Sequence, residues 1–207
     1  MNESPLPTES ITGLVLAGGQ ARRMGGVDKG LVEVAGRAMI EHVLDALRPQ
    51  VGMLLINANR NREAYARYGC EVVADAQAGY LGPLAGVASA LAVIDTPYLL
   101  TAPCDSPLLP VDLAARLSAA LQRDRARIAV AHDGERQQPV FLLLERSLGP
   151  DLQDYLASGG RKIDQWFARH ALAEADLGDR RECFINVNDA DERARVEALL
   201  RSHRPPA

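Results

Sequence analysis

The 207-residue sequence lacks the features that mark several specialised classes of protein. Its three cysteines are scattered and form no C-x-x-C pair, which argues against a disulfide scaffold and a structural zinc site. The net charge of −4 provides no global positive field, so we expect no binding to nucleic acid or to an anionic membrane surface. Apolar runs long enough to span a bilayer are also missing, and we expect no membrane-spanning segment.

The ends of the sequence carry no targeting signal that we can identify. Residues 1–10 (MNESPLPTES) are polar, contain proline and lack the apolar core of a signal peptide. The cysteine usage fits the reducing cytoplasm, so we expect a soluble cytoplasmic protein. A chain of this length with 47% hydrophobic residues can bury a core, and we expect one domain over 11–201 with flexible tails at 1–10 and 202–207.

Short apolar runs alternate with amphipathic segments along the chain. The apolar runs predict strands at 12–17, 51–57, 70–74, 98–102, 127–132, 138–144 and 183–187. Helical spacing predicts helices at 38–48, 61–68 and 84–94, after Pro110, at 148–169 in two pieces broken at Gly159-Gly160, and after Asp189. A hairpin across Asp133-Gly134 is possible. The alternation predicts an α/β fold with a mainly parallel central sheet and helices on both faces.

Residues 14–30, LVLAGGQARRMGGVDKG, are the most informative segment. An apolar run stops at Gly18 and Gly19, and small residues there let backbone N–H groups approach an anion without interference from Cβ. Arg23 and Lys29 add positive charge. The spacing is neither that of a P-loop nor that of a dinucleotide fingerprint. A solvated surface turn is the simpler alternative, but the position directly after a buried strand favours a loop that wraps the phosphates of a nucleotide.

Asp105 lies in the segment PCDSP (103–107), directly after the predicted strand 98–102. Mg²⁺ takes oxygen ligands and is usually held by one or two carboxylates together with substrate phosphates, a role that Asp105 fits. The alternative is an aspartate that caps a turn. Cys104 beside it is expected to be a small buried residue, not a nucleophile, because no histidine is near it in sequence.

Polar residues also follow other predicted strands. Asn57 and Asp75 close two of them, and Asn186 and Asn188 punctuate residues 183–189. Each could be only a cap or a turn former. Because the carboxyl ends of parallel strands meet at one edge, these side chains could together contact a base and a ribose there.

Two further segments are ambiguous. In GPLAG (82–86) a turn precedes a small-residue helix, whose N-terminus could face an anion or could simply be a tight packing turn. Arg161 and Lys162 could hold a second anionic substrate or be a solvated surface pair. The four histidines have no ligand spacing, and we assign them no role.

In their order and spacing these segments resemble the molybdenum cofactor guanylyltransferases, the MobA family. The resemblance runs from Ile11 to about Leu200 and is most specific in ITGLVLAGGQARRMGGVDKG (11–30), NANR (57–60), GPLAG (82–86), PCDSP (103–107), HDGER (132–136) and INVN (185–188). It implies a Rossmann-like nucleotidyltransferase fold and transfer of GMP from GTP to molybdenum-bound molybdopterin, with release of pyrophosphate.

The resemblance also implies roles for individual residues. The guanine nucleotide would be held by the backbone of Leu16, Ala17 and Gly18, its nucleoside by Asn57 and Asp75, and its phosphates by Lys29, Arg23 and the loop glycines, Gly18 and Gly19. Asp105 would bind both Mg²⁺ and the nucleotide, and Lys29, Asp105 and Arg23 would carry the chemistry. Asn186 and Asn188 would lie near the pterin, with Arg161 a weaker candidate there and Arg22 a bystander.

Gly18 favours guanine, because the cytidine-transferring relatives carry alanine at this point and the missing methyl leaves room for a purine. A phosphate nucleophile is already ionised, so no histidine base is expected. The expected partners are GTP, the molybdenum cofactor, other cofactor-biosynthesis proteins and molybdoenzyme chaperones, and the expected state is a monomer. Two alternatives remain: a nucleotidyltransferase that uses CTP or a sugar or polyol phosphate, and a non-catalytic cofactor-delivery protein, although delivery needs neither Lys29 nor Asp105.

Overall fold

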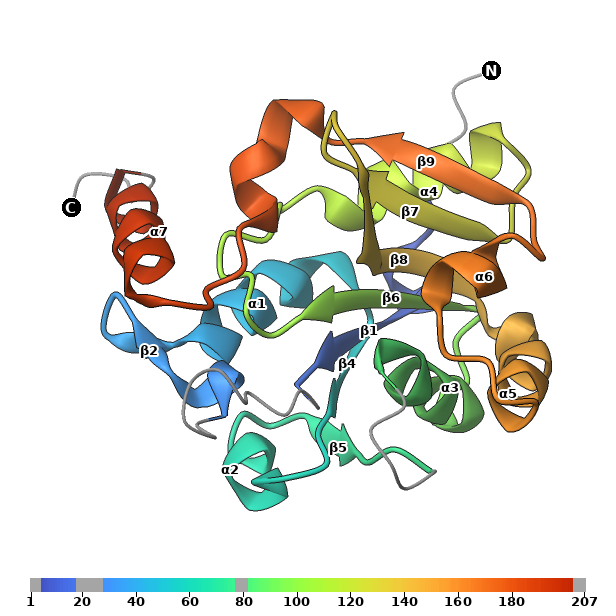
Figure 1. Cartoon of the computed structure of the whole chain (residues 1–207), viewed down its shortest axis with the longest axis horizontal. Coiled ribbons are helices and arrows are strands. Elements are labelled where there is room, and N and C mark those ends of the chain that lie inside the picture. Colours follow the sequence, from blue (N-terminus) through green and yellow to red (C-terminus); the bar gives the residue numbers. More distant parts are fainter. Residues whose placement is uncertain (1–4, 18–27, 77–81, 203–207) are drawn as a thin grey trace.

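The computed structural model describes residues 5–17, 28–76 and 82–202. A seven-stranded sheet with the order β5–β4–β1–β6–β8–β7–β9 lies at its centre (Figure 1). The strands are β1 (Ile11–Leu16), β4 (Met53–Asn57), β5 (Glu71–Val73), β6 (Tyr98–Pro103), β7 (Ile128–His132), β8 (Gln137–Glu145) and β9 (Leu172–Asp176).

The sheet is mostly parallel, as predicted. β1, β4, β5 and β6 pair in parallel, and so do β7 and β9, whereas β8 runs antiparallel between β6 and β7. The hairpin from β7 to β8 turns at Asp133-Gly134. Asp133 Oδ1 accepts the backbone N–H groups of Glu135 and Arg136, each at 2.8 Å, and Gly134 has a φ of +91°. A positive φ is costly for residues with a Cβ, so glycine suits this turn.

Helices cover both faces of the sheet, again as predicted. On one face α1 (Met39–Leu47) and α4 (Leu113–Arg123) share a core with Val15, and on the other α3 (Pro83–Val93), α5 (Gly149–Ala157) and α6 (Ile163–Phe167) share one with Leu14. Adjacent residues of a strand point to opposite faces, which explains why Leu14 and Val15 belong to different cores. The short helix α2 (Arg62–Ala66) lies between β4 and β5 in the chain.

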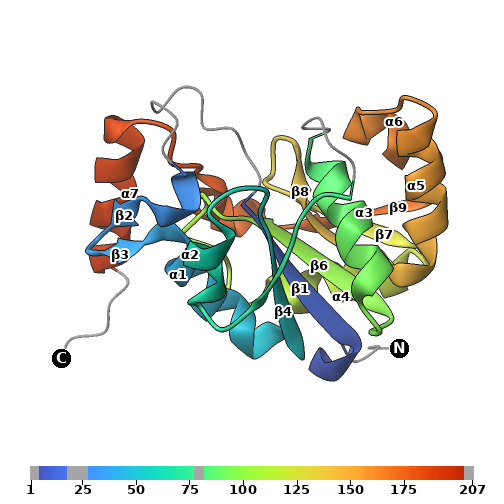
Figure 2. The ribbon, with the colours of Figure 1, turned by 90° about the horizontal axis from the view of Figure 1, so that it is seen from below.

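A smaller cluster lies at one end of the molecule. The short strands β2 (Glu33–Val34) and β3 (Arg37–Ala38) form a hairpin beside α7 (Ala190–Ser202). Figure 2 shows these elements together at the left, far from α5 and α6. Val34, Met39, Val187 and Val196 are all buried in this cluster. Residues distant in sequence therefore form a satellite core that holds the segment before α7 in place.

The prediction of a strand at 183–187 was wrong. Residues Gly178–Phe184 form 3-10 turns, and the strand at this edge of the sheet is β9. The apolar residues of 183–187 are buried for a different reason, since Phe184 contacts Phe141 edge to face at 4.9 Å and Val187 enters the satellite core. β9 was missed because only two alanines of LAEAD are buried and alanine has a weak preference for strands.

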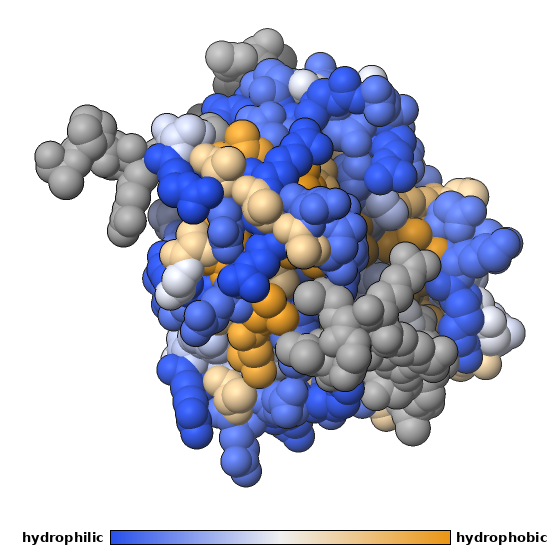
Figure 3. Space-filling view, turned by 60° about the vertical axis from the view of Figure 1, so that its left-hand side comes forward, coloured by the Kyte–Doolittle hydropathy of each residue, from blue (hydrophilic) through white to orange (hydrophobic). Residues whose placement is uncertain are grey.

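Part of the predicted N-terminal tail has defined structure. Thr8–Ser10 form a 3-10 turn, and a Cβ at Gly52 would lie 2.8 Å from the Cα of Glu9. The division of the chain into one domain and two tails stays a prediction. None of the described helices has the length and apolar character needed to cross a membrane. Polar side chains cover most of the described surface on the face turned forward in Figure 3, with apolar atoms between them.

Candidate active site

The strand register aligns four strand ends. Leu16 at the end of β1 lies opposite Asn57 of β4 and Pro103 of β6, and Asn57 lies opposite Val73 of β5. The residues that follow these strands therefore emerge at one edge of the sheet, which is where ligands bind in open α/β sheets. Asp105 is among these residues.

Lys29 forms the centre of a polar group at this edge. Its Nζ lies 2.9 Å from Asp105 Oδ2 and 2.5 Å from Asn188 Oδ1. The side chain of Lys29 is 24% exposed and that of Asp105 is 16% exposed, so their charges interact with less solvent screening than a surface pair. Asp105 Oδ1 accepts no hydrogen bond from the described residues. One carboxylate oxygen is thus paired and the other is available to a ligand.

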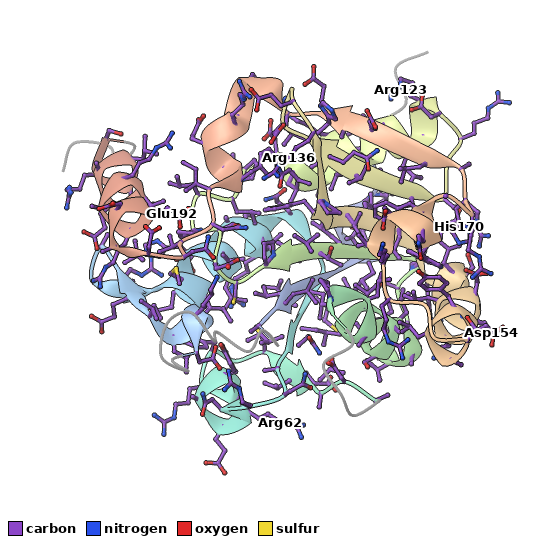
Figure 4. The ribbon with its side chains drawn as sticks, viewed as in Figure 1. Arg62, Arg123, Arg136, Asp154, His170 and Glu192 are labelled. Carbon is purple, nitrogen blue, oxygen red and sulfur yellow. The ribbon has the colours of Figure 1, made fainter. Side chains whose placement is uncertain are left out.

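The segment from Asn186 to Asn188 is fastened to the end of β6. The backbone N–H of Val187 donates to the Asp105 carbonyl at 3.0 Å, and Ser106 Oγ donates to Asn186 Oδ1 at 2.6 Å. Glu192, at the beginning of α7 (Figure 4), accepts the backbone N–H of Asn188 through Oε2 at 2.6 Å. These bonds place both asparagines next to the Lys29–Asp105 pair.

The start of α7 is capped by Asp189. Asp189 Oδ1 accepts the backbone N–H of Glu192 at 2.8 Å, which satisfies one of the N–H groups that a helix leaves without an internal partner. The cap fixes where the helix begins and thereby the direction in which the chain leaves Asn188.

Asn57 and Asp75 contact each other. Asn57 Nδ2 donates to Asp75 Oδ1 at 2.9 Å, and Asn59 Nδ2 donates to Asp75 Oδ2 at 2.7 Å. Asn59 Oδ1 in turn accepts the backbone N–H of Asp75 at 2.8 Å. The carboxylate is therefore held in one orientation by two amides. The sequence predicted Asn57 and Asp75 as neighbours but did not single out Asn59.

The absence of a side chain at Gly86 makes room for Asn57. A Cβ at Gly86 would lie 2.3 Å from Asn57 Oδ1 and 3.0 Å from Leu16 Cδ2. Gly86 belongs to α3, which begins after Gly82 at a φ of +80° and has Pro83 as its first residue. Gly86 therefore packs closely against Asn57, and the suggestion that the start of α3 faces an anion stays a prediction.

Two backbone groups of the first loop are already used by the sheet. Ala17 N–H donates to the Asn57 carbonyl at 2.8 Å, and the Leu16 carbonyl accepts Cys104 N–H at 3.1 Å. A nucleotide contact through the Ala17 N–H would have to replace the first of these bonds. Gly18, Gly19, Arg22 and Arg23 lie outside the described residues, so their predicted roles stay predictions.

Arg161 is engaged at the carboxyl end of α5. Its Nη1 donates to the carbonyls of Leu156 at 2.7 Å and Gly160 at 2.5 Å. A cation at this position stabilises the last carbonyls of a helix. Among the described residues no hydrogen bond or ion pair joins Arg161 to the Lys29–Asp105 pair.

Cys104 is buried next to Asp105. Burial is the main cause that raises the pKa of the Cys104 thiol well above its ordinary value, and the nearby carboxylates of Asp105 and Asp28 raise the pKa further. A protonated, buried thiol is a poor nucleophile and a poor metal ligand. This agrees with the interpretation of Cys104 as a small buried residue.

The metal-binding capacity of this edge rests on one carboxylate. The described ranges contain no group of three or more histidine, cysteine or acidic residues that could hold a metal by themselves. Mg²⁺ needs no such cage, because it is commonly held by one or two carboxylates and by the phosphates of its substrate. Asp105 with its available Oδ1 fits such a partial site.

A cavity of about 750 Å³ lies elsewhere, at the opposite edge of the sheet, between the start of β6 and the start of α5. Tyr98, Glu145 and Arg146 are among its lining residues. The size of this cavity does not make it the active site, because the polar group built on Lys29 and Asp105 is at the other edge of the sheet.

Comparison with known proteins assigns the chain to a family. Residues 13–175 match the family described as MobA-like NTP transferase domain. The chain belongs to this family. A protein named molybdenum cofactor guanylyltransferase from Shewanella sp. (strain ANA-3) is 51% identical over 190 residues, which cover 92% of this chain and 96% of the relative. A protein of the same name from Shewanella halifaxensis (strain HAW-EB4) is 48% identical over 197 residues, or 95% and 98% of the two chains.

Solved structures of other proteins have the same fold as this MobA-like NTP transferase domain. Molybdopterin-guanine dinucleotide biosynthesis protein A from Archaeoglobus fulgidus superimposes with a TM-score of 0.77 at 23% identity and covers 92% of this chain and 99% of its own. A 4-diphosphocytidyl-2C-methyl-D-erythritol synthase from Anaerococcus prevotii superimposes with a TM-score of 0.71 at 14% identity, covering 94% and 97%. Proteins with different names share this fold, so the fold alone does not identify the nucleotide.

Sequence reasoning missed several polar residues of the MobA-like domain. Ser106 and Asn59 hold Asn186 and Asp75, and Asp28 is a buried carboxylate that accepts hydrogen bonds from Asn61 and Tyr65. The second asparagine of NANR was the available signal for Asn59. For Tyr65 no local signal exists, because its partner lies 37 positions away.

Proposed function

We propose that the chain transfers GMP from GTP to the molybdenum-molybdopterin cofactor, forming molybdopterin guanine dinucleotide and releasing pyrophosphate. Relatives that carry the name of this activity match nearly the whole chain at about half identity, for example 51% over 190 residues. The observation that carries the proposal is the Lys29–Asp105 ion pair at the same sheet edge as the Asn57–Asp75 pair. A cation, a free carboxylate oxygen and fixed amides suit a nucleoside triphosphate.

The nucleoside contacts are assigned to Asn57 and Asp75. Their orientation is fixed by the hydrogen bond between them and by Asn59. Fixed polar groups discriminate well between ligands, because a wrong ligand leaves them desolvated and unpaired. Gly18 is proposed to favour guanine over cytosine by leaving space for the purine.

The triphosphate contacts are assigned to Lys29, with Arg23 and the loop glycines Gly18 and Gly19 as further contributors. Lys29 Nζ has three N–H donors, of which Asp105 and Asn188 accept two, so one is left for a phosphate oxygen. Asp105 would hold Mg²⁺ through Oδ1. When bound, Mg²⁺ neutralises phosphate charge and polarises the α-phosphate as a Lewis acid.

The reaction follows from these contacts. An oxygen of the terminal phosphate of molybdopterin forms a bond to the α-phosphorus of GTP. The bond from that phosphorus to the oxygen that bridges to the β-phosphate breaks, and pyrophosphate leaves with the electron pair. Both reactants are anions, so neutralisation by Lys29 and Arg23 and orientation of the reactants lower the barrier. A phosphate monoester is largely ionised at neutral pH, so no protein base has to remove a proton.

The pterin side of the site is assigned to Asn186 and Asn188, and Arg161 is a weaker candidate. The asparagines are supported by the hydrogen bonds that hold them beside Lys29. Arg161 would have to contact the acceptor with guanidinium N–H groups that do not already donate to the end of α5. We also propose a cytoplasmic monomer that meets cofactor-biosynthesis proteins and molybdoenzyme chaperones.

The decisive experiment incubates the protein with labelled GTP, Mg²⁺ and molybdenum-molybdopterin. Release of pyrophosphate with formation of a GMP-containing product is the expected result. Parallel reactions contain CTP, or a sugar phosphate in place of the pterin. Faster turnover with CTP or a sugar phosphate would replace the proposed substrates. Binding of GTP and molybdopterin without any pyrophosphate would favour a delivery protein instead.

A further inference from the structure

Asp28, the residue before Lys29, is a buried carboxylate without a cationic partner among the described residues. It is 6% exposed, and no lysine, arginine or histidine of the described ranges forms an ion pair with it. A carboxylate withdrawn from water destabilises the fold unless hydrogen bonds replace its hydration. Its presence at this position therefore calls for an explanation in terms of its neighbours.

Two donors from one short stretch bind this carboxylate. The Tyr65 hydroxyl of α2 donates to Asp28 Oδ1, and Asn61 Nδ2, at the beginning of α2, donates to Asp28 Oδ2 at 3.2 Å. Tyr65 is fully buried. Burial, followed by the neighbouring Cys104 and Asp28, raises the pKa of the Tyr65 hydroxyl, so the hydroxyl keeps its proton and remains a donor.

The tyrosine also touches the backbone on the other side of Lys29. A Cβ at Gly30 would lie 2.6 Å from the Tyr65 hydroxyl oxygen and 3.3 Å from Cys104 Cβ. Gly30 thus fits closely against Tyr65 and against the residue that precedes Asp105. The residues on both sides of Lys29 are fixed by the same aromatic side chain.

Local backbone bonds make this segment a short rigid turn. Leu31 N–H donates to the Asp28 carbonyl at 3.0 Å, and Val32 N–H donates to the Lys29 carbonyl at 3.1 Å. Lys29 is therefore the first residue of a 3-10 turn, and the carboxylate of the residue before it, Asp28, is bound by α2 and by Asn61 at its beginning. The side chain of Lys29 reaches from this turn to Asp105.

We propose that Tyr65 is a positioning residue for Lys29: by binding the buried Asp28 carboxylate and packing on Gly30, it fixes the backbone from which Lys29 reaches the triphosphate. The inference rests on the proposed function, because it concerns the same nucleotide site. It adds that α2, which supplies none of the predicted substrate contacts, controls the phosphate-binding lysine through one hydroxyl group.

The test is a double-mutant cycle on GTP affinity, measured by titration calorimetry with Tyr65→Phe, Lys29→Ala and the double variant. Loss of a hydrogen bond to a charged group predicts that Tyr65→Phe weakens GTP binding about tenfold. In the Lys29→Ala background the same change should have almost no effect, because the lysine that it positions is gone. Tyr68→Phe is the matched control, since its hydroxyl forms no hydrogen bond with the described residues, and it should bind GTP like the wild type.

Additive losses in the double variant, or unchanged affinity of Tyr65→Phe, would overturn the inference. A wild-type protein that binds no GTP would instead refute the proposed function, so the two failures are distinguishable. If Tyr65→Phe does not fold, Asn61→Gly replaces it in the cycle. Glycine tolerates the φ of +50° at Asn61, so this variant removes only the second donor to Asp28.

Discussion

Lys29 Nζ lies 2.9 Å from Asp105 Oδ2, although 76 positions of sequence separate the two residues. Both side chains are partly buried and have lost part of their hydration. The opposite charge of the partner compensates each of them for this loss. A nucleoside triphosphate with Mg²⁺ would present the same two charges in complementary form, phosphate for Lys29 and a cation for Asp105. The groups that the pair leaves for these ligands are the third N–H of Lys29 and Oδ1 of Asp105.

Replacement of Asp105 should abolish most of the activity. We expect Asp105→Ala to lower kcat by about 10²-fold or more, the loss typical of a preorganised electrostatic group. Asp105→Asn should behave similarly, because an amide retains the shape but not the charge. Pyrophosphate release at saturating GTP measures the effect, and near-wild-type turnover of either variant would rule out the metal-binding role.

Replacement of Lys29 should separate binding from stability. We expect Lys29→Ala to weaken GTP binding at least about tenfold, the effect of losing a charged hydrogen bond. The melting temperature without ligand should hardly change, since the Lys29 side chain is 24% exposed and water can take its place beside Asp105. Calorimetric titration and thermal unfolding give the two quantities. A large fall in the melting temperature would mark Lys29 as structural.

Gly86 offers a test of the nucleoside assignment. We expect Gly86→Ala to weaken GTP binding and to destabilise the fold by about 1–3 kcal/mol, because its Cβ would overlap Asn57 and force that amide away from Asp75. Gly149→Ala is the control, since its Cβ would make only an ordinary contact of 3.4 Å with Leu91. Equal GTP affinities for the two variants would contradict the role of Asn57.

Asp151 should make the stability depend on acid. Burial tends to raise its pKa, but hydrogen bonds from Trp166 and His170 and the charge of Arg169 outweigh burial and hold the pKa of Asp151 below its usual range. A carboxyl group whose pKa is lower in the folded than in the unfolded state stabilises the fold at pH values above its unfolded pKa of about 3.9. This stabilisation is lost as the pH falls through the folded pKa. The stability advantage of the wild type over Asp151→Asn should therefore be full at pH 6 and shrink below about pH 4.

Urea unfolding of both proteins at several pH values from about 6 down to about 3 measures this advantage. A constant difference across the range would show that the carboxylate contributes through its shape and not through its charge.

Much of the fold was predictable because local patterns of apolar residues determine which segments form strands and helices. Val15 and Leu14 alternate between two cores, and the helices carry apolar residues at helical spacing. The edge at which Asn57 and Asp105 emerge followed from the rule for parallel strands. By contrast, the run at 183–187 looks like a strand because it is apolar, yet its buried residues serve two separate clusters. Local hydrophobicity predicts burial but not the partner in the sheet.

The finer geometry of the site was not predictable for a related reason. The bond from Lys29 to Asn188 joins residues 159 positions apart, and that from Tyr65 to Asp28 joins residues 37 positions apart. No periodicity of the sequence encodes such pairs, since they form only when the elements that carry them pack together. The residue types could be singled out, but their partners came from the structure.

The late position of Asn188 in the chain has a consequence for synthesis. Translation proceeds from the N-terminus at about 5–20 residues per second, so roughly 4–17 seconds separate the synthesis of Asp105 from that of Asn188. During this interval the nascent chain already contains both charges of the ion pair and the strands that bring them together. Its last hydrogen-bond acceptor for Lys29 is still missing. Lys29 and Asp105 are thus synthesised before the segment that carries Asn188, and a ribosome stalled in between would hold the residues of the ion pair without that segment.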